Sequence, residues 1–299
     1  MNASRAALIG ADRGDDVVVM AFARATTSTT VSVSRRAALA RCARRRAGAR
    51  RVDGAGDDDA VRRGLAWSSR RECRAWSSSS SRVVDARDDD AVRLAVRALG
   101  EGKVIAVPTD TIYGFAACAR SARGVEALYR IKSRNAAQPL AIAVGDVRDV
   151  GTYGEVEHLP RGLLEAILPG PVTVLTKRRA GARGASESLN PGVDLIGIRV
   201  PNSDFVRAVC RAHQGAIALT SANKSGETST TAVDEFAPLW DGCERVFDGG
   251  RIEAQRLGST IVDLSSHDGA YAIVREGERC ASLVRVLEDV YNLRLKTTT

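Results

Sequence analysis

The sequence lacks the two glycine-rich loops that most often bind nucleotides. Gly102-Lys103 is followed by Val104 rather than by Ser or Thr, and Arg97 stands where a phosphate-binding loop needs its first glycine. No G-x-G-x-x-G opens a predicted helix, so the usual dinucleotide fingerprint is missing as well. If the protein binds a nucleotide, side chains rather than a glycine loop must hold most of it.

Histidines, cysteine pairs, aromatic rings and long apolar runs are also scarce. The three histidines, His158, His213 and His267, stand outside any nucleophile or zinc motif, so catalysis by histidine is not expected. The six cysteines form no C-x-x-C pair and have no zinc-like spacing, a pattern that fits a reducing compartment. Aromatic residues make up only 4% of the chain, which disfavours a nucleic-acid binder built on stacked rings. No apolar run approaches the roughly 18 residues of a membrane helix, and we expect no membrane partner.

Positive charge is abundant, but it lies in the first part of the chain. The net charge is +8, from 44 basic and 36 acidic side chains. Residues 1–82 hold 17 of those basic and 8 of those acidic residues, a net of +9, so residues 83–299 hold 27 and 28, a net of −1. A general RNA or DNA binder more often carries its positive charge on the folded domain. The charge distribution therefore argues against nucleic-acid binding by residues 83–299.

The first 82 residues are predicted to be a disordered leader and linker. Between residues 21 and 52 there are nine arginines and no acidic residue, the composition of a mitochondrial or plastid transit peptide. Met20 stands just before this stretch and is an alternative start to Met1. Ser77–Ser81 is a run of five serines, typical of a linker. We expect import into a mitochondrion or chloroplast; an untargeted tail and a cytosolic form are the alternatives.

The remaining residues, 83–299, alternate short apolar runs with amphipathic segments and show no internal repeat. The apolar runs predict strands over Lys103–Val107, Leu140–Val144, Val172–Thr176, Leu195–Val200, Ile217–Leu219, Ile261–Leu264 and Tyr271–Val274. Helical spacing predicts helices over residues 91–99 (capped by Asp88–Asp90), Ser121–Ile131, Val147–Tyr153, Gly162–Leu168, the segment of Phe205 and Val209 (capped by Pro201-Asn202), Val233–Leu239 and Leu283–Leu293. This mixture predicts one α/β domain with a twisted, mixed sheet.

Cationic and hydroxyl side chains gather at the ends of the predicted elements. The polar turn Pro108–Thr111 ends one strand, Ser221 and Asn223 follow another, and Lys132 and Arg134 follow a helix. Arginine offers phosphate a planar fork, and lysine offers a compact point charge. Spacing alone therefore predicts an anion or nucleotide site and leaves the reaction open. We expect Lys132 and Arg134 at a cavity rim, where substitutions lower activity with little loss of stability.

Six sequence blocks resemble the YrdC family of threonylcarbamoyl-AMP synthases, in that family's order and spacing. The blocks are VPTDTIYGFA, YRIKSRNAAQPLAIAV, LPGPVTVLTKR, IGIRVPNSDF, ALTSANKSG and RLGSTIVDL, and the resemblance spans about residues 84–293. It implies a single α/β domain, with flanking helices around a cationic cavity, in the short form of the family. It also implies that L-threonine, bicarbonate and ATP give threonylcarbamoyl-AMP and pyrophosphate.

The resemblance also assigns roles to matching residues. Lys132 and Arg134 would bind ATP phosphates and carry the catalysis, and further ATP contacts fall on Gln138, Thr173, Ser221, Asn223, Ser229 and Arg275. L-threonine would be held by Thr111, Lys177 and Ser259. Some longer members carry asparagine, histidine and arginine where this chain has Gln138, Ala143 and Lys177.

The cofactor and partners follow from the same resemblance. Mg²⁺ would be held mainly through the phosphates, because no carboxylate cluster in the sequence marks a metal site. A partner enzyme complex would transfer the threonylcarbamoyl group to the adenosine beside the anticodon of tRNA, with at most a weak tRNA contact to this chain.

Two other functions are compatible with a cationic cavity. A non-catalytic RNA-binding module is disfavoured by the net charge of −1 over residues 83–299 and by the few aromatic residues. A carbamoyl-adenylate enzyme for another acceptor, as in hydrogenase maturation, is disfavoured because acylphosphatase-like and zinc-finger segments are missing. If purified residues 83–299 release pyrophosphate only when threonine and bicarbonate are present, the synthase function is supported over both alternatives.

Overall fold

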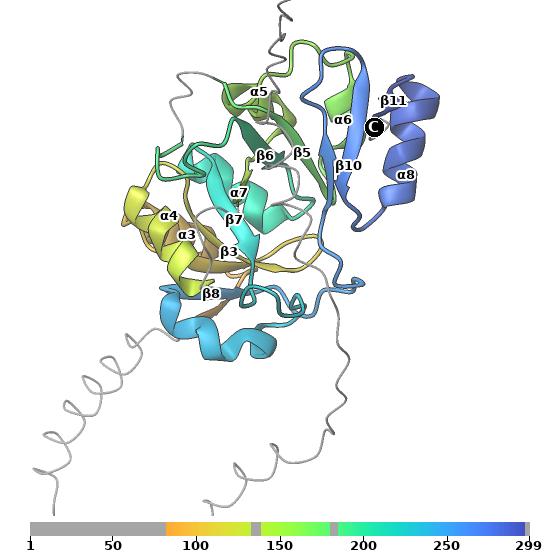
Figure 1. The fold of residues 1–299 in the computed structure, drawn as a ribbon. Helices are drawn as coiled ribbons and strands as arrows, with labels where there is room; N and C mark the ends of the chain where they lie inside the picture. Colours follow the sequence, from red (N-terminus) through yellow and green to blue (C-terminus); the bar gives the residue numbers. More distant parts are fainter. Residues whose placement is uncertain (1–81, 133–138, 180–184, 297–299) are drawn as a thin grey trace, which may run out of the picture. The chain divides into compact units, whose positions relative to one another are not determined.

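The computed structural model describes residues 82–132, 139–179 and 185–296. Within them the strands form one eleven-stranded mixed sheet with helices on both faces (Figure 1), which confirms the predicted fold class. In sheet order the strands are β1 (Val83–Asp85), β8 (Arg245–Asp248), β2 (Ile105–Pro108), β3 (Tyr113–Cys118), β7 (Ile217–Ser221), β4 (Ala141–Ala143), β6 (Leu195–Arg199), β5 (Val172–Lys177), β9 (Thr260–Asp263), β10 (Ala270–Arg275) and β11 (Arg294–Leu295).

The helices are short, and the longest α-helices have ten residues. They are α3 (Ala91–Gly100), α4 (Ala122–Ile131), α5 (Val150–Tyr153), α6 (Leu163–Ile167), α7 (Asp204–His213) and α8 (Cys280–Arg285), with the 3₁₀-helices η1 (Val147–Asp149) and η2 (Val233–Gly242) and the π-helix η3 (Val286–Val290). None of the helices in the described ranges is both long and apolar enough to cross a bilayer.

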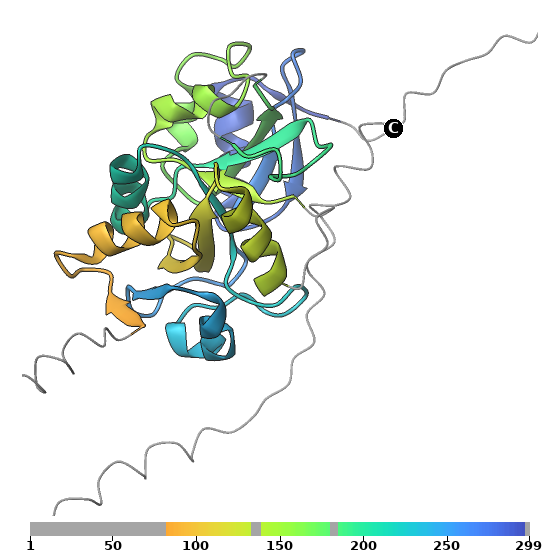
Figure 2. The same cartoon turned by 90° about the vertical axis from the view of Figure 1, so that its left-hand side faces the viewer.

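The two faces of the sheet bury separate cores. Because successive residues of a strand point to opposite faces, β3 sends Phe115 into one core and Ala116 into the other. The Phe115 core includes residues of α4 and η2, and the Ala116 core includes residues of α3 and α7. Helices α3 and α7 lie side by side (Figures 1 and 2). With both faces covered, all six residues of β3 are buried, which explains its continuous apolar sequence.

Most predicted elements are present within a few residues of their expected bounds, but four differ. Strands β1, β3 and β8 were not predicted, because they lack the long alternating pattern that marks a strand. The final helix was expected over Leu283–Leu293; the structure instead has α8, then η3, and then the short strand β11.

Of the predicted helix caps, one is confirmed in position but makes no capping bond, and another is wrong. Asp90 occupies the cap position of α3 but makes no capping hydrogen bond, because its carboxylate pairs with Arg93 at 2.9 Å. Helix α7 is capped by Ser203, whose Oγ accepts from the Val206 N–H, rather than by Pro201-Asn202. Helix α4 is capped as its serine predicts, with Ser121 Oγ accepting from Gly124 N at 3.1 Å.

Candidate active site

A cavity of about 1090 Å³, its opening to solvent included, lies on the sheet face that also carries α3 and α7. Its floor consists of residues paired across neighbouring strands, namely Gly114 with Ser221, Ala141 with Leu219, and Thr173 with Ile261. The neighbouring strand lies close here, since a Cβ on Gly114 would be 2.8 Å from the side-chain atom Leu219 Cδ1 and 3.0 Å from the main-chain oxygen of Thr220. The sheet register therefore joins segments that are far apart in the sequence.

Lys132 directly follows α4 as its C-cap, and its ammonium is surrounded by oxygens from the end of β7 and the residues after it. Its Nζ donates to the main-chain and side-chain oxygens of Ser221 at 2.9 and 3.1 Å, and to those of Asn223 at 2.6 and 3.1 Å. The amide nitrogen of Asn223 donates to the carbonyls of Lys224 and Glu227, which fixes the orientation of the Asn223 side chain. We call these three residues, Lys132, Ser221 and Asn223, the lysine wall. Lys132 is only 3% exposed, so the predicted rim position is wrong.

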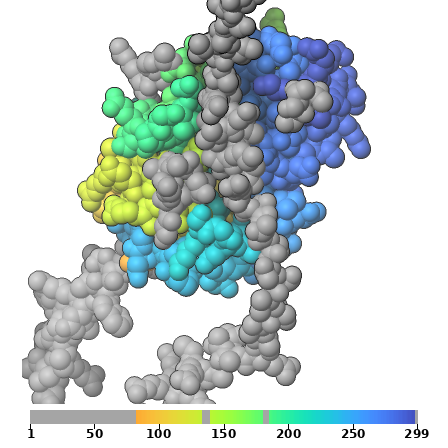
Figure 3. Space-filling model, in the orientation of Figure 1, coloured from red at the N-terminus to blue at the C-terminus, as the bar shows by residue number. Residues whose placement is uncertain are grey.

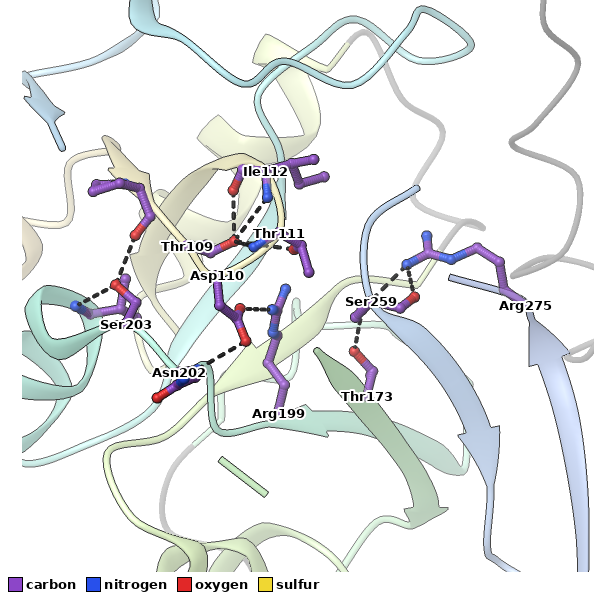
Figure 4. A network of polar contacts seen from close by, with 12 residues as sticks. Thr109, Asp110, Thr111, Ile112, Thr173, Arg199, Asn202, Ser203, Ser259 and Arg275 are labelled. Carbon is purple, nitrogen blue, oxygen red and sulfur yellow. Dashed lines mark hydrogen bonds and ion pairs between the residues drawn. The ribbon is translucent and has the colours of Figure 1, made fainter. Parts of the chain in front are cut away.

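Two hydroxyls and an arginine of the lining form a second group, which we call the hydroxyl wall; it consists of Thr173, Ser259 and Arg275. Thr173 Oγ1 and Ser259 Oγ are 2.8 Å apart (Figure 4). Arg275 Nη2 donates to the carbonyl oxygen of Ser259 at 2.7 Å and lies 3.3 Å from its hydroxyl. Gly258 allows this approach, because it has a φ of +72° and a Cβ there would lie 3.3 Å from Arg275 Nη2.

The turn after β2 is held together by Thr109. Its Oγ1 donates to the carbonyl of Ile112 at 2.6 Å and accepts from the N–H groups of Thr111 and Ile112, both at 3.2 Å. Thr109 lines the cavity, whereas Thr111 is fully buried with its Oγ1 3.2 Å from that of Thr109 (Figure 4). The residue of this turn that lines the cavity is therefore Thr109, which was not predicted.

Two arginines that were not predicted also line the cavity. Arg199, at the end of β6, pairs with Asp110 at 2.6 Å, and both side chains are over 90% buried. Arg256 donates from both terminal nitrogens to Glu235 at 2.6 and 2.7 Å, and a hydrogen bond from Arg256 lowers the pKa of Glu235 to about 2. The Arg199 pair could have been suspected from the sequence, since a charge in an apolar strand such as β6 needs a partner.

Most of the predicted site residues meet in this cavity. Those that line it are Lys132, Thr173, Ser221, Asn223, Ser229, Ser259 and Arg275. Thr111 lies directly behind the lining. Arg134 and Gln138 fall outside the described residues, although Lys132 and Pro139 on either side of them line the cavity.

Lys177 is not brought to the cavity. It is exposed at the far end of β5, four residues beyond Thr173, and it does not line the cavity. Four strand residues span about 13 Å, which accounts for the separation. The predicted threonine contact of Lys177 therefore has no support from the geometry.

The charge of the lining favours an anionic ligand. Among the described residues of the lining, the cations are Lys132, Arg199, Arg256 and Arg275, and the one carboxylate is that of Glu227. Partly enclosed cations interact with an anion more strongly than exposed ones. None of the three histidines lines the cavity. In the part of the chain that the structure describes, no group of three or more His, Cys, Asp or Glu residues could hold a metal ion.

The fold and the cavity define an α/β domain with a cavity whose side chains suit an anionic small molecule. Comparison with known proteins narrows this class. The Sua5/YciO/YrdC family model, described as "Telomere recombination", matches residues 97–277. The threonylcarbamoyl-AMP synthase of Homo sapiens is 43% identical over 209 residues, which cover 68% of this chain and 73% of that protein. The chain therefore belongs to the Sua5/YciO/YrdC family, as the sequence blocks predicted.

Solved structures agree with this assignment. The crystal structure of P. abyssi Sua5 complexed with L-threonine superposes with a TM-score of 0.62 at 25% identity, over 72% of this chain and 62% of that one. The chain thus spans less than two thirds of that Sua5 chain. E. coli YciO shares the fold, with a TM-score of 0.57 at 23% identity.

Figure 3 shows the C-terminal residues (blue) and α4 (yellow-green) on opposite sides of the visible face of the folded domain.

Proposed function

We propose that this chain is a threonylcarbamoyl-AMP synthase, which forms threonylcarbamoyl-AMP and pyrophosphate from L-threonine, bicarbonate and ATP. The observation that carries the proposal is the convergence of the lysine wall and the hydroxyl wall on one cationic cavity. The name of the 43%-identical human relative supports the same reaction.

The reaction brings two anions together. The threonine nitrogen bonds to the carbon of CO₂ derived from bicarbonate and loses a proton, which gives a carbamate. A carbamate oxygen then attacks the α-phosphorus of ATP, and the bond to the bridging oxygen breaks, so that pyrophosphate leaves with the electron pair. Because the carbamate and the triphosphate repel each other, fixed cations and close positioning lower the barrier.

The residues divide this work between the two walls. The Lys132 ammonium is fixed among four oxygens, so it supplies positive charge that need not reorganise during the reaction. Arg275 offers a guanidinium fork for phosphate oxygens, and the bonded hydroxyls of Thr173 and Ser259 offer donors that orient a ligand. No covalent enzyme nucleophile is required.

Mg²⁺ is proposed to enter with ATP. Its protein ligands would come from the oxygen donors of the lining, such as the hydroxyls of Thr173 and Ser259 and the carboxylate of Glu227. This sparse set suits an ion that keeps several waters and is held mainly by substrate phosphates. Bound there, it would neutralise charge on the departing pyrophosphate.

The product is proposed to pass to a separate enzyme that transfers the threonylcarbamoyl group to the adenosine beside the tRNA anticodon. We also propose that the arginine-rich, acid-free stretch within residues 1–82 directs the protein to a mitochondrion or chloroplast. Imaging of this segment fused to a fluorescent reporter tests the second point. A reporter that stays in the cytosol contradicts it.

Pyrophosphate release tests the central proposal. The purified protein is expected to release pyrophosphate from ATP only when threonine and bicarbonate are both present. Release that needs neither, or RNA binding without any turnover, would contradict a threonylcarbamoyl-AMP synthase.

A further inference from the structure

Two loops that line the cavity meet at the carboxylate of Glu235. The loop between β7 and η2, residues 222–232, contributes Ser229 to the lining, and the loop between β8 and β9, residues 249–259, contributes Arg256. Glu235 itself lies in η2 and does not line the cavity. A change at Glu235 can therefore reach a ligand only through the loops that it holds.

The carboxylate of Glu235 has a partner in each loop. In the first loop, Thr231 N donates to Oε2 at 3.0 Å. From the second loop, Arg256 donates to both carboxylate oxygens, at 2.6 and 2.7 Å, and Arg251 donates to Oε1 at 3.2 Å. Arg256 also donates from Nη1 to the carbonyl of Ser229 at 2.8 Å, which joins the two loops directly. We call Glu235, Arg251 and Arg256 the loop clasp.

The backbone of Arg256 is consistent with a residue that is held in place. Its φ is +65°, in the left-handed region that residues other than glycine rarely adopt. Such a conformation is unfavourable and persists where the surrounding contacts maintain it. The paired bonds between Arg256 and Glu235 are contacts of this kind, because a guanidinium and a carboxylate match each other in geometry. The loop clasp therefore fixes the course of the second loop where it enters the lining.

The loop clasp acts on one part of the lining more than on another. Ser229, whose carbonyl accepts from Arg256, is predicted to contact ATP. Ser259 is predicted to contact threonine and is held by bonds outside the clasp, since its carbonyl accepts from Arg275 and its hydroxyl lies 2.8 Å from that of Thr173. Loosening the clasp should therefore disturb the part of the cavity that binds ATP and leave the threonine contacts in place.

We propose that Glu235 is a positioning residue for ATP, which fixes the two loops through Arg256 in the arrangement that binds the nucleotide. The proposal deepens the proposed function and rests on it. Because Glu235 acts through another side chain, its effect should disappear when Arg256 is already lost.

Glu235→Gln is the first test, because it removes the charge and keeps the size of the side chain. The KM for ATP should rise about tenfold, with kcat and the KM for threonine within about twofold of the wild-type values. Arg256→Lys keeps the charge but removes the fork, and it should raise the KM for ATP in the same direction. Equal rises in the KM for ATP and for threonine, or no rise in either, would overturn the proposal.

Asp146→Asn is the matched control. Asp146 accepts from Arg211 at 2.6 and 2.9 Å, and these two side chains are 25% and 48% exposed, against 23% and 37% for Glu235 and Arg256. Neither residue of the control pair lines the cavity, so the KM values for ATP and threonine should stay within about twofold. A tenfold rise in the KM for ATP in this variant as well would overturn the assignment, since any lost ion pair would then have the same effect.

A double-mutant cycle tests whether Glu235 acts through Arg256. In an Arg256→Gln background, Glu235→Gln should raise the KM for ATP by less than about twofold, because the paired bonds are already gone. If the two single effects multiply in the double variant, Glu235 does not act through Arg256 and the proposal fails.

Calorimetric titration with ATP alone separates this proposal from the proposed function. Glu235→Gln should bind ATP about tenfold more weakly than the wild-type protein. That result in a protein that makes no pyrophosphate would contradict the proposed function and leave Glu235 as a positioning residue for ATP. Equal Kd values for the two proteins, or no binding by either, would overturn the positioning role whatever the turnover.

Discussion

The two walls of the cavity hold their polar groups in different ways. In the lysine wall, one ammonium is surrounded by four oxygens from two residues that follow each other closely at the end of β7. In the hydroxyl wall, two hydroxyls from different strands bond to each other, and a half-buried arginine donates to one of them. The lysine wall is therefore built into the local structure, whereas the hydroxyl wall depends on fewer bonds between side chains of separate strands.

This difference predicts at which residues a substitution affects ligand binding without affecting the stability of the fold. A buried donor that loses its acceptors, or acceptors that lose their donor, cost about 1–3 kcal/mol per unsatisfied group. Substitution of Lys132 should thus disturb stability and activity together. Substitution in the hydroxyl wall should affect mainly the ligand.

The largest effect is expected for Lys132→Ala. Activity should fall at least about 100-fold, because a preorganised donor of this kind contributes roughly 10²–10³ in kcat. The free energy of unfolding should also fall by about 1–3 kcal/mol, since the oxygens of Ser221 and Asn223 lose their shared donor. Pyrophosphate release and thermal unfolding measure the two quantities. Unchanged stability would mean that the lysine wall is not part of the local structure.

Arg275→Gln should have the next largest effect. The guanidinium fork is lost, and kcat/KM for ATP is expected to fall about 10- to 100-fold. Stability should change by less than about 1 kcal/mol, because Arg275 is half-buried and sits at the end of a strand. Steady-state kinetics with ATP as the varied substrate, together with a melting curve, give both values. A stability loss as large as that of Lys132→Ala would remove the contrast between the walls.

A double-mutant cycle sharpens the description of the hydroxyl wall. Thr173→Val and Ser259→Ala should each weaken substrate binding a few-fold, and their effects should not add, because the two hydroxyls are 2.8 Å apart. We expect a coupling of about 0.5–1.5 kcal/mol from the KM values for threonine and ATP. Strict additivity would show that the two hydroxyls act separately.

The smallest effect is expected for Lys177→Ala. Its side chain is exposed and lies outside the cavity, so activity should stay within about twofold and stability within about 0.5 kcal/mol. Lys132 and Lys177 were both assigned to the site from the sequence, and this variant separates them. A tenfold rise in the KM for threonine would restore Lys177 to the threonine site.

Much of the fold could be predicted from local pattern. Proline at position 108 and the apolar run before it mark the end of β2, and Ser121 marks the start of α4. Strand β3 was not predicted; it is buried on both faces, and a continuous apolar run fits a buried strand or a buried helix segment equally well. Strand β1 has only three residues, and its pairing with β8 joins segments about 160 residues apart, which no local pattern contains.

The site was less accessible to sequence reasoning. Spacing indicated an anion site near Lys132, and the family resemblance supplied its other members. Neither indicated that Lys132 is buried, that Thr109 rather than Thr111 reaches the lining, or that Lys177 points elsewhere, because these depend on strand register and on the reach of side chains. Arg199 did leave a signal, since it is the only charge within residues 195–200.

The most direct test follows the carbon of bicarbonate into the product. The purified protein is incubated with ATP, L-threonine and ¹³C-bicarbonate, and the adenylates formed are analysed by mass spectrometry. The account predicts threonylcarbamoyl-AMP that carries one ¹³C and is formed in equal amounts with pyrophosphate, with almost none from Lys132→Ala. ATP turnover without a labelled adenylate, or equal product from Lys132→Ala, would contradict it.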